Sequence, residues 1–179
     1  MPADRTDKEA VRRALIENRD ALREACAAVS DRDWAHAASG WSAAQILEHL
    51  VRTERTTLRH LKAAGPSPEA DPGRDRQVEL ARRRGRKFEA PPLVRPQGLP
   101  VPRAELWAAF EAARADSLAW LDSEPDLRSH ALPHPFFGML DGYQWLLFFA
   151  AHGDRHLLQL RELRARAAPA RPTSGGEPR

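Results

Sequence analysis

Cysteine, lysine and long apolar runs are scarce in this chain of 179 residues, and each scarcity excludes something. Cys26 is the single cysteine, so no internal disulfide can form, and we expect a reducing cytoplasm as the compartment. The longest unbroken apolar stretch, residues 145–151, is much shorter than the about 18 residues that cross a membrane. The charged N-terminal residues have no apolar segment behind them, which argues against a secretory signal. We therefore expect no membrane partner.

Aromatic residues make up only 7% of the chain, and β-branched residues are few beside alanine and leucine, which argues against an all-β protein. The net charge is +3, and lysine supplies only three of the 28 basic residues. An arginine excess reflects a GC-rich genome as readily as a surface for a polyanion, and a charge of +3 is weak evidence for such a surface. Nucleic-acid binding is thus the weakest hypothesis, and we expect no nucleic-acid partner.

Proline is absent from three windows, residues 3–65, 103–124 and 136–168. Because proline breaks the interior of a helix, the helices are predicted to lie inside these windows. The first window holds two helices, since serine, aspartate and glycine interrupt the helical pattern at residues 30–40. The other two windows hold one helix each. Four amphipathic helices predict an all-α fold, a four-helix bundle.

Each predicted helix has an apolar stripe, a start signal or both. Thr6 is the predicted cap of the first helix, and Ser42 and Asp141, each followed three residues later by glutamine, have the spacing of a capping box. The last helix is predicted to end at about Ala167. The stripes consist of Val11, Leu15, Leu22, Cys26 and Val29 in the first helix, Ile46, Leu50, Leu58 and Leu61 in the second, and Leu106, Phe110, Ala113, Leu118 and Leu121 in the third.

The connection between the second and third helices, residues 64–102, is too long for a simple bundle turn and indicates a crossover. Residues 75–87 are predicted to form a short helix with a basic, solvated end. The proline-rich residues 88–102 are predicted to be an extended strap. We expect Phe88, Leu93 and Val94 to dock this strap on the fold. The predicted domain covers residues 1–167, and residues 168–179 are predicted to be a disordered tail.

Three histidines carry the expected chemistry. His152 and His156 are four residues apart on the apolar face of the last helix, a spacing at which both imidazoles can bind one cation. His49 lies in an apolar setting on the second helix. At about 1.5 Å per residue, antiparallel packing of the two helices places His49 between the levels of His152 and His156. The residues therefore predict a metal site at His49, His152 and His156, with positions left open for water or substrate.

The alternative for each of these residues is a core histidine with a polar partner, but few polar partners lie on these stripes. A zinc-protease reading of His152 and His156 fails because residue 153 is glycine, where that motif needs a glutamate base. Several other residues have structural readings. His36, His60 and His130 are predicted at the surface or in loops, His134 against the last helix, Trp34 and Trp41 as core plugs, and Cys26 as an inert core thiol.

The segments GWSAAQILEHL (40–50), HPFFGML (134–140) and WLLFFAAHGDRHLLQL (145–160) resemble the DinB superfamily of DinB-like or YfiT-like metalloenzymes. The strap FEAPPLVRPQG (88–98) is similar to a segment of the same family. The resemblance implies an up-down-down-up bundle, often a homodimer, with a divalent metal, zinc or nickel, held by His49, His152 and His156. It also implies a small-molecule substrate, since characterised relatives include transferases and isomerases that use a low-molecular-weight thiol.

We therefore expect a metal-dependent enzyme, a thiol transferase or a hydrolase, in which the metal lowers the pKa of a water or a thiol. The alternative is a non-catalytic metal-binding stress or interaction module. No general base stands out in the sequence. Glu54 and Gln159 are suggested only by their proximity to the histidines, so the catalytic residues stay unassigned.

Overall fold

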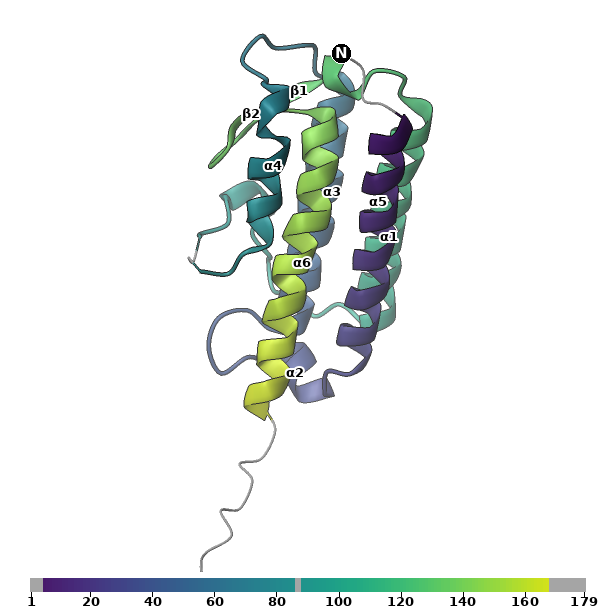
Figure 1. Ribbon diagram of the computed structural model, residues 1–179. Helices are drawn as coiled ribbons and strands as arrows, with labels where there is room; N and C mark the ends of the chain where they lie inside the picture. Colours follow the sequence, from purple (N-terminus) through teal and green to yellow (C-terminus); the bar gives the residue numbers. More distant parts are fainter. Residues whose placement is uncertain (1–4, 86–87, 168–179) are drawn as a thin grey trace, which may run out of the picture.

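The computed structural model describes residues 5–85 and 88–167. The predicted tail, residues 168–179, and the basic residues Arg86 and Lys87 lie outside these ranges. Four long helices form a bundle: α1 (Arg5–Ala27), α3 (Ala43–Ala63), α5 (Arg103–Ser123) and α6 (Gly142–Ala167). In Figure 1, α1 and α6 run in one direction and α3 and α5 in the other. The prediction of a four-helix bundle is confirmed.

Two of the predicted start signals are confirmed by hydrogen bonds. The Ser42 hydroxyl accepts the Gln45 N–H at 3.3 Å, and the Gln45 side-chain oxygen accepts the Ser42 N–H at 3.0 Å. Asp141 and Gln144 form the same reciprocal pair, at 2.9 and 3.1 Å, before α6. The predicted cap at Thr6 is wrong, because α1 already begins at Arg5.

A small sheet was not expected from the sequence, so the all-α prediction is incomplete. Strands β1 (Ala131–His134) and β2 (Gly138–Asp141) pair antiparallel in a hairpin that leads into α6. Gly138 has a φ of +71°, a conformation that glycine adopts more easily than residues with a side chain. Pro133 lies within β1, which is tolerated because a two-stranded sheet consists only of edges.

Shorter elements complete the chain. They are α2 (Asp31–Ala35), η1 (Pro72–Arg74), α4 (Asp75–Val78), η2 (Glu79–Arg82), η3 (Pro92–Val94) and η4 (Leu127–Ser129). The helix predicted over residues 75–87 is therefore shorter than expected. Of the three strap residues expected to dock, Val94 is half-buried, and Phe88 is 49% exposed but packs against Phe136 of the hairpin with ring centroids 4.5 Å apart. The prediction is wrong for Leu93, which is 59% exposed. Phe88 and Leu93 both line a cavity.

The buried side chains form two apolar clusters, one toward each end of the bundle. All five residues of the stripe predicted for the first helix are buried, and so are all four of the stripe predicted for the second. A polar layer lies between the two clusters along the sequence of every long helix: Asn18 in α1, Glu54 in α3, Arg114 and Ser117 in α5, and Asp154 in α6. The core is thus apolar at both ends and polar in the middle.

Candidate metal centre and the adjoining cavity

The three predicted ligands come together. The Nε2 atom of His152 lies 3.2 Å from Nε2 of His49 and 3.0 Å from Nε2 of His156. All three ligand atoms lie within 4.8 Å of one another. A tetrahedral cation with ligands at about 2.05 Å separates its ligand atoms by about 3.3 Å, so the spacing fits one small divalent ion. Helix α3 supplies His49, and α6 supplies the pair.

The outer nitrogens of two of these rings are held by oxygen atoms. Nδ1 of His49 donates to the Val94 carbonyl at 2.8 Å, and Nδ1 of His156 donates to the side-chain oxygen of Gln159 at 2.9 Å. A hydrogen on Nδ1 of a neutral imidazole leaves a lone pair on Nε2, the form that binds a metal. Such contacts around the ligands fix ring orientation in metal sites. Val94 connects the strap to the site, which the sequence did not indicate.

The protons of the cluster do not suffice to satisfy its nitrogens. His49 and His156 both present lone pairs, and Nε2 of His152 has at most one hydrogen when the ring is neutral. A single N–H group on His152 cannot donate fully to the lone pairs of both His49 and His156. At least one of these lone pairs therefore lacks a hydrogen. A cation at the centre would satisfy all three lone pairs once His152 also presents one.

Burial keeps the rings neutral. Desolvation lowers the pKa of His49, and it lowers the pKa of His152 and His156 well below the ordinary value of 6.5. Repulsion among the rings themselves acts in the same direction. The cluster therefore offers neutral nitrogen ligands at pH 7, and protons compete weakly with a cation.

Aromatic rings surround the cluster. Phe148 stacks on His152 with ring centroids 4.9 Å apart and planes 15° apart, and Trp41 stacks on His156 at 6.2 Å. Trp41 is half-buried and packs against one of the two apolar clusters, so the prediction that it fills the core is confirmed in part, but its ring also contacts the histidines. Trp34 is buried, as predicted. The rings lower the local dielectric around the imidazoles, which strengthens electrostatic interactions there.

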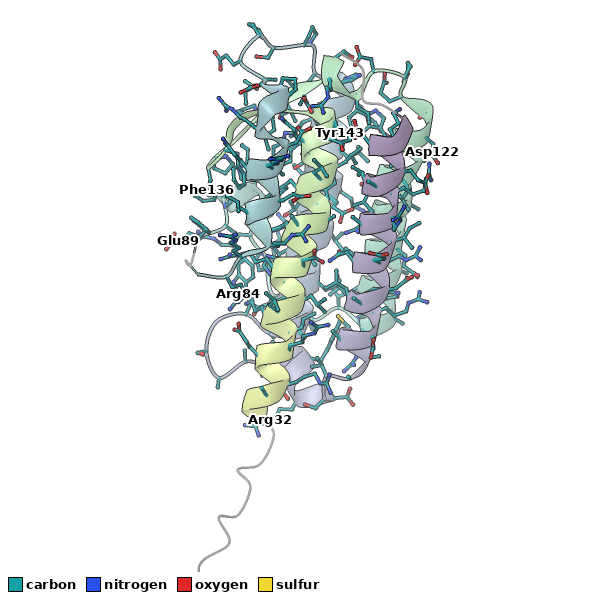
Figure 2. All side chains as sticks on the ribbon, in the orientation of Figure 1. Arg32, Arg84, Glu89, Asp122, Phe136 and Tyr143 are labelled. Atoms are coloured by element: carbon teal, nitrogen blue, oxygen red, sulfur yellow. The ribbon has the colours of Figure 1, made fainter. Side chains whose placement is uncertain are left out.

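The cluster forms part of the wall of a cavity of about 880 Å³. Helices α3 and α6 make one side, and the segment after η2, the strap and the β1–β2 hairpin make the other. Figure 2 shows three lining residues, Arg84, Glu89 and Phe136, along the flank of the bundle beside α4. The cavity is of a size that takes small molecules.

Glu54 and Gln159, the two residues suggested as catalytic groups by their proximity in the sequence, form hydrogen bonds with other residues. The Glu54 carboxylate accepts hydrogen bonds from Arg114 and Ser117 in the core. Gln159 accepts the Nδ1 hydrogen of His156. Of the described residues that line the cavity, Glu89 is the sole carboxylate, and its exposed side chain pairs with Arg95. The described residues that line the cavity thus offer no buried carboxylate as a general base beside the cluster.

The remaining predicted residues lie where a structural role explains them. His36 and His60 are exposed, and His130 is half-buried with Nδ1 3.0 Å from the Leu61 carbonyl at the end of α3. Cys26 is buried, and desolvation raises its pKa to about 12, which fits an inert thiol.

No helix in the described parts of the chain combines the length and apolarity that a membrane span requires.

A helical bundle that gathers three imidazole nitrogens on the wall of a cavity defines a class of candidate metalloproteins. Residues 7–160 match the DinB superfamily, and the chain belongs to that family. The chain is 28% identical over 129 residues to YuaE of Bacillus subtilis (strain 168), which is described as uncharacterized. The match covers 71% of this chain and 79% of YuaE. The fold is similar to the crystal structure of TT2238, described as a four-helix bundle protein, with a TM-score of 0.55 and 22% identity over 88% of this chain and 98% of TT2238.

Proposed function

We propose that this chain is a metal-dependent enzyme that binds one divalent cation, zinc or nickel, through His49, His152 and His156. The observation that carries the proposal is the convergence of three Nε2 atoms. Two of them present lone pairs, because the Nδ1 hydrogens of His49 and His156 are donated to Val94 and Gln159. The up-down-down-up topology belongs to the same proposal, because it sets His49 level with the pair on α6. The helix directions in Figure 1 support it.

The reaction we propose is the transfer of a low-molecular-weight thiol to a small molecule, with hydrolysis as the second choice. A bound divalent cation supplies a Lewis acid that lowers the pKa of a nucleophile, so a protein base is not required. The chain itself supplies the apolar wall, orients the three rings and keeps them neutral. We propose that the protein acts in the cytoplasm as a homodimer, in line with its lone buried cysteine and its family.

A non-catalytic metal-binding module is the competing function. The scarcity of carboxylates around the cavity favours it, because hydrolases with a bound metal commonly add a general base. A thiol transferase has less need of such a base, which is why we place thiol transfer first.

Metal loading tests the site. The protein should take up one equivalent of zinc or nickel, measured by elemental analysis after removal of excess metal. His49→Ala and His152→Ala should lose tight loading. His60→Ala is the matched control, because His60 lines the same cavity outside the cluster. Equal loading by His152→Ala and the parent would show that the ligand set is wrong.

Turnover tests the reaction. Zinc-loaded, nickel-loaded and metal-free protein are compared against a panel of thiols and electrophiles, with His49→Ala as the inactive reference. Metal-dependent thiol transfer above that reference is the expected result. A protein that loads one metal but shows no turnover with any pair would support the binding module.

A further inference from the structure

His134, at the end of β1, is held in one tautomer. Its Nδ1 atom accepts the backbone N–H groups of Phe136 and Phe137, at 3.1 and 3.3 Å. An imidazole nitrogen that accepts two N–H groups carries no hydrogen, so in the neutral ring the hydrogen sits on Nε2. Desolvation lowers the pKa of His134 to about 4, which keeps the ring neutral at pH 7.

The Nε2–H group of His134 has no hydrogen-bond partner among the residues that the structure describes. The side chain is only 7% exposed, yet it lines the cavity. The indole N–H of Trp145, whose ring packs against His134 with centroids 5.1 Å apart, is occupied by the Leu132 carbonyl at 3.2 Å. Nε2 is not among the described side-chain atoms that are fully buried without a partner, so its N–H group is open to the cavity, and its role there calls for an explanation.

The location of His134 supplies one. Phe148 packs edge-to-face against His134 with ring centroids 4.5 Å apart, and it also stacks on His152, at 4.9 Å. A single aromatic ring therefore separates the open donor from the three-histidine cluster. Holding the turn at residues 134–137 explains the role of Nδ1, but it leaves Nε2 unexplained. Contact of Nε2–H with the Phe148 ring would be weak, and an oxygen acceptor would replace it.

We propose that Nε2–H of His134 donates a hydrogen bond to an oxygen atom, a carbonyl or a carboxylate, of a small molecule bound in the cavity. The apolar walls around His134 would hold an aromatic or aliphatic body, and the donor would fix its oxygen one ring away from His152. This ligand class deepens the proposed function, since the molecule is the substrate, but its binding does not require the cation. His134 is thus a ligand-binding residue of the cavity.

The test uses the full chain with histidine labelled by nitrogen-15, both metal-free and zinc-loaded. The probes are benzamide, benzoate and toluene, which share a ring and differ in the acceptor. Nuclear magnetic resonance should first show His134 with its hydrogen on Nε2. Benzamide, benzoate or both should then shift the Nε2–H proton downfield, and toluene should not. The responding probe tells whether a neutral carbonyl or a carboxylate is preferred.

Two variants separate ligand binding from a purely structural role. His134→Phe keeps the ring and removes the donor, so the responding probe should bind about 2- to 10-fold more weakly while toluene is unaffected. His134→Gln restores a donor near the Nε2 position and should recover part of that loss. His36→Gln, an exposed residue outside the cavity, is the control.

Two results would overturn the inference. One is a hydrogen on Nδ1 in the parent protein, a measurement that needs no variant to fold. The other is an Nε2–H resonance that none of the probes moves. Loss of metal loading in the parent would instead count against the proposed function alone, because the probes are also tested without metal.

Discussion

Two groups of polar residues, one buried and the other largely buried, lie close together in this bundle and differ in how their hydrogen bonds are satisfied. The first is the Arg114 layer, made of Asn18, Glu54, Arg114 and Ser117. The second is the three-histidine cluster of His49, His152 and His156. In the layer, the guanidinium of Arg114 donates to Glu54, to Asn18 and to the Leu15 carbonyl, so its charge is met from several sides. In the cluster, three nitrogens face one another with too few hydrogens between them.

Buried polar groups that serve structure can therefore be distinguished from those that serve function by whether their hydrogen bonds are complete. Arg114 is fully buried and Glu54 is 2% exposed, and each completes the other's hydrogen bonds. The hydrogen bonds of such a layer are complete without a bound molecule, so we infer that the layer determines how the helices pair. In the histidine cluster at least one lone pair lacks a hydrogen, and the cluster adjoins a cavity. An incomplete buried group beside a cavity is the better guide to function.

The largest expected effect comes from breaking the closed layer. Arg114→Met should lower the free energy of unfolding by about 3–5 kcal/mol, because it leaves the Glu54 carboxylate buried without its cation. Urea unfolding measures it, and Arg13→Met on the exposed face of α1 is the control. The double variant Arg114→Met/Glu54→Met should regain much of the loss. A single variant as stable as the parent would mean that the layer is not an interdependent unit.

Acid should act on the histidines. The pKa of His134 is lowered by burial to about 4 in the folded protein, from 6.5 in the unfolded chain. Its contribution to stability is therefore complete above pH 6.5 and is lost as the pH falls toward 4. The loss is about 3 kcal/mol, and the histidine cluster adds to it in the same direction.

Unfolding of metal-free protein across this pH range measures the acid effect, with His134→Phe as the comparison. Between pH 7 and pH 4 the free energy of unfolding should fall more in the parent than in the variant, because only the parent has this histidine to protonate. A gap that stays constant from pH 7 to pH 4 would mean that His134 titrates normally.

Gly153 joins the two groups, since it follows His152 and lies against Asn18. A Cβ atom there would stand 2.2 Å from the Asn18 side-chain oxygen. Gly153→Ala should therefore cost about 1–3 kcal/mol and should weaken metal loading by displacing α6 from α1. Gly65→Ala is the matched control, because its Cβ would meet nothing within 4 Å. Thermal unfolding and metal uptake of both variants check this, and equal behaviour would show that α1 and α6 can separate at no cost.

The smallest change in stability is expected at the cluster itself. His152→Leu should alter the metal-free free energy of unfolding by less than about 1 kcal/mol, because it replaces an incompletely bonded ring with an apolar side chain. The same change should abolish the rise in melting temperature that zinc or nickel gives the parent. A large loss of stability without metal would place His152 with the closed layer and would contradict the comparison.

The helices and the grouping of His49, His152 and His156 were predictable because both depend on spacing along the chain. Proline-free windows, capping boxes and an i, i+4 histidine pair are local signals. Arg114 was not predictable in this way, since an arginine in an alanine-rich helix is ordinarily exposed, and only its partners on α1 and α3 explain its burial. The role of Val94 was hidden because a carbonyl has no signature in the sequence.

His134 and the hairpin show a second reason for incomplete prediction. Proline disfavours strands in general, and the strand pairing of residues 131–141 outweighs that local preference at Pro133. The tautomer of His134 depends on two backbone N–H groups that only the folded turn brings to one nitrogen. Long-range contacts of this kind determine what a histidine can donate or accept, and residue type alone does not.

The bond from His49 to the Val94 carbonyl has a consequence for how this protein can diversify. Every amino acid has a carbonyl, so the bond constrains the path of the strap and leaves the identity of residue 94 free. Neighbouring side chains such as Phe88 and Leu93 face the cavity from the same segment. Mutations there can reshape the pocket for a new ligand while the ring of His49 keeps its orientation. The shape of the cavity wall and the orientation of the His49 ring can thus change independently, although one short segment of chain determines both.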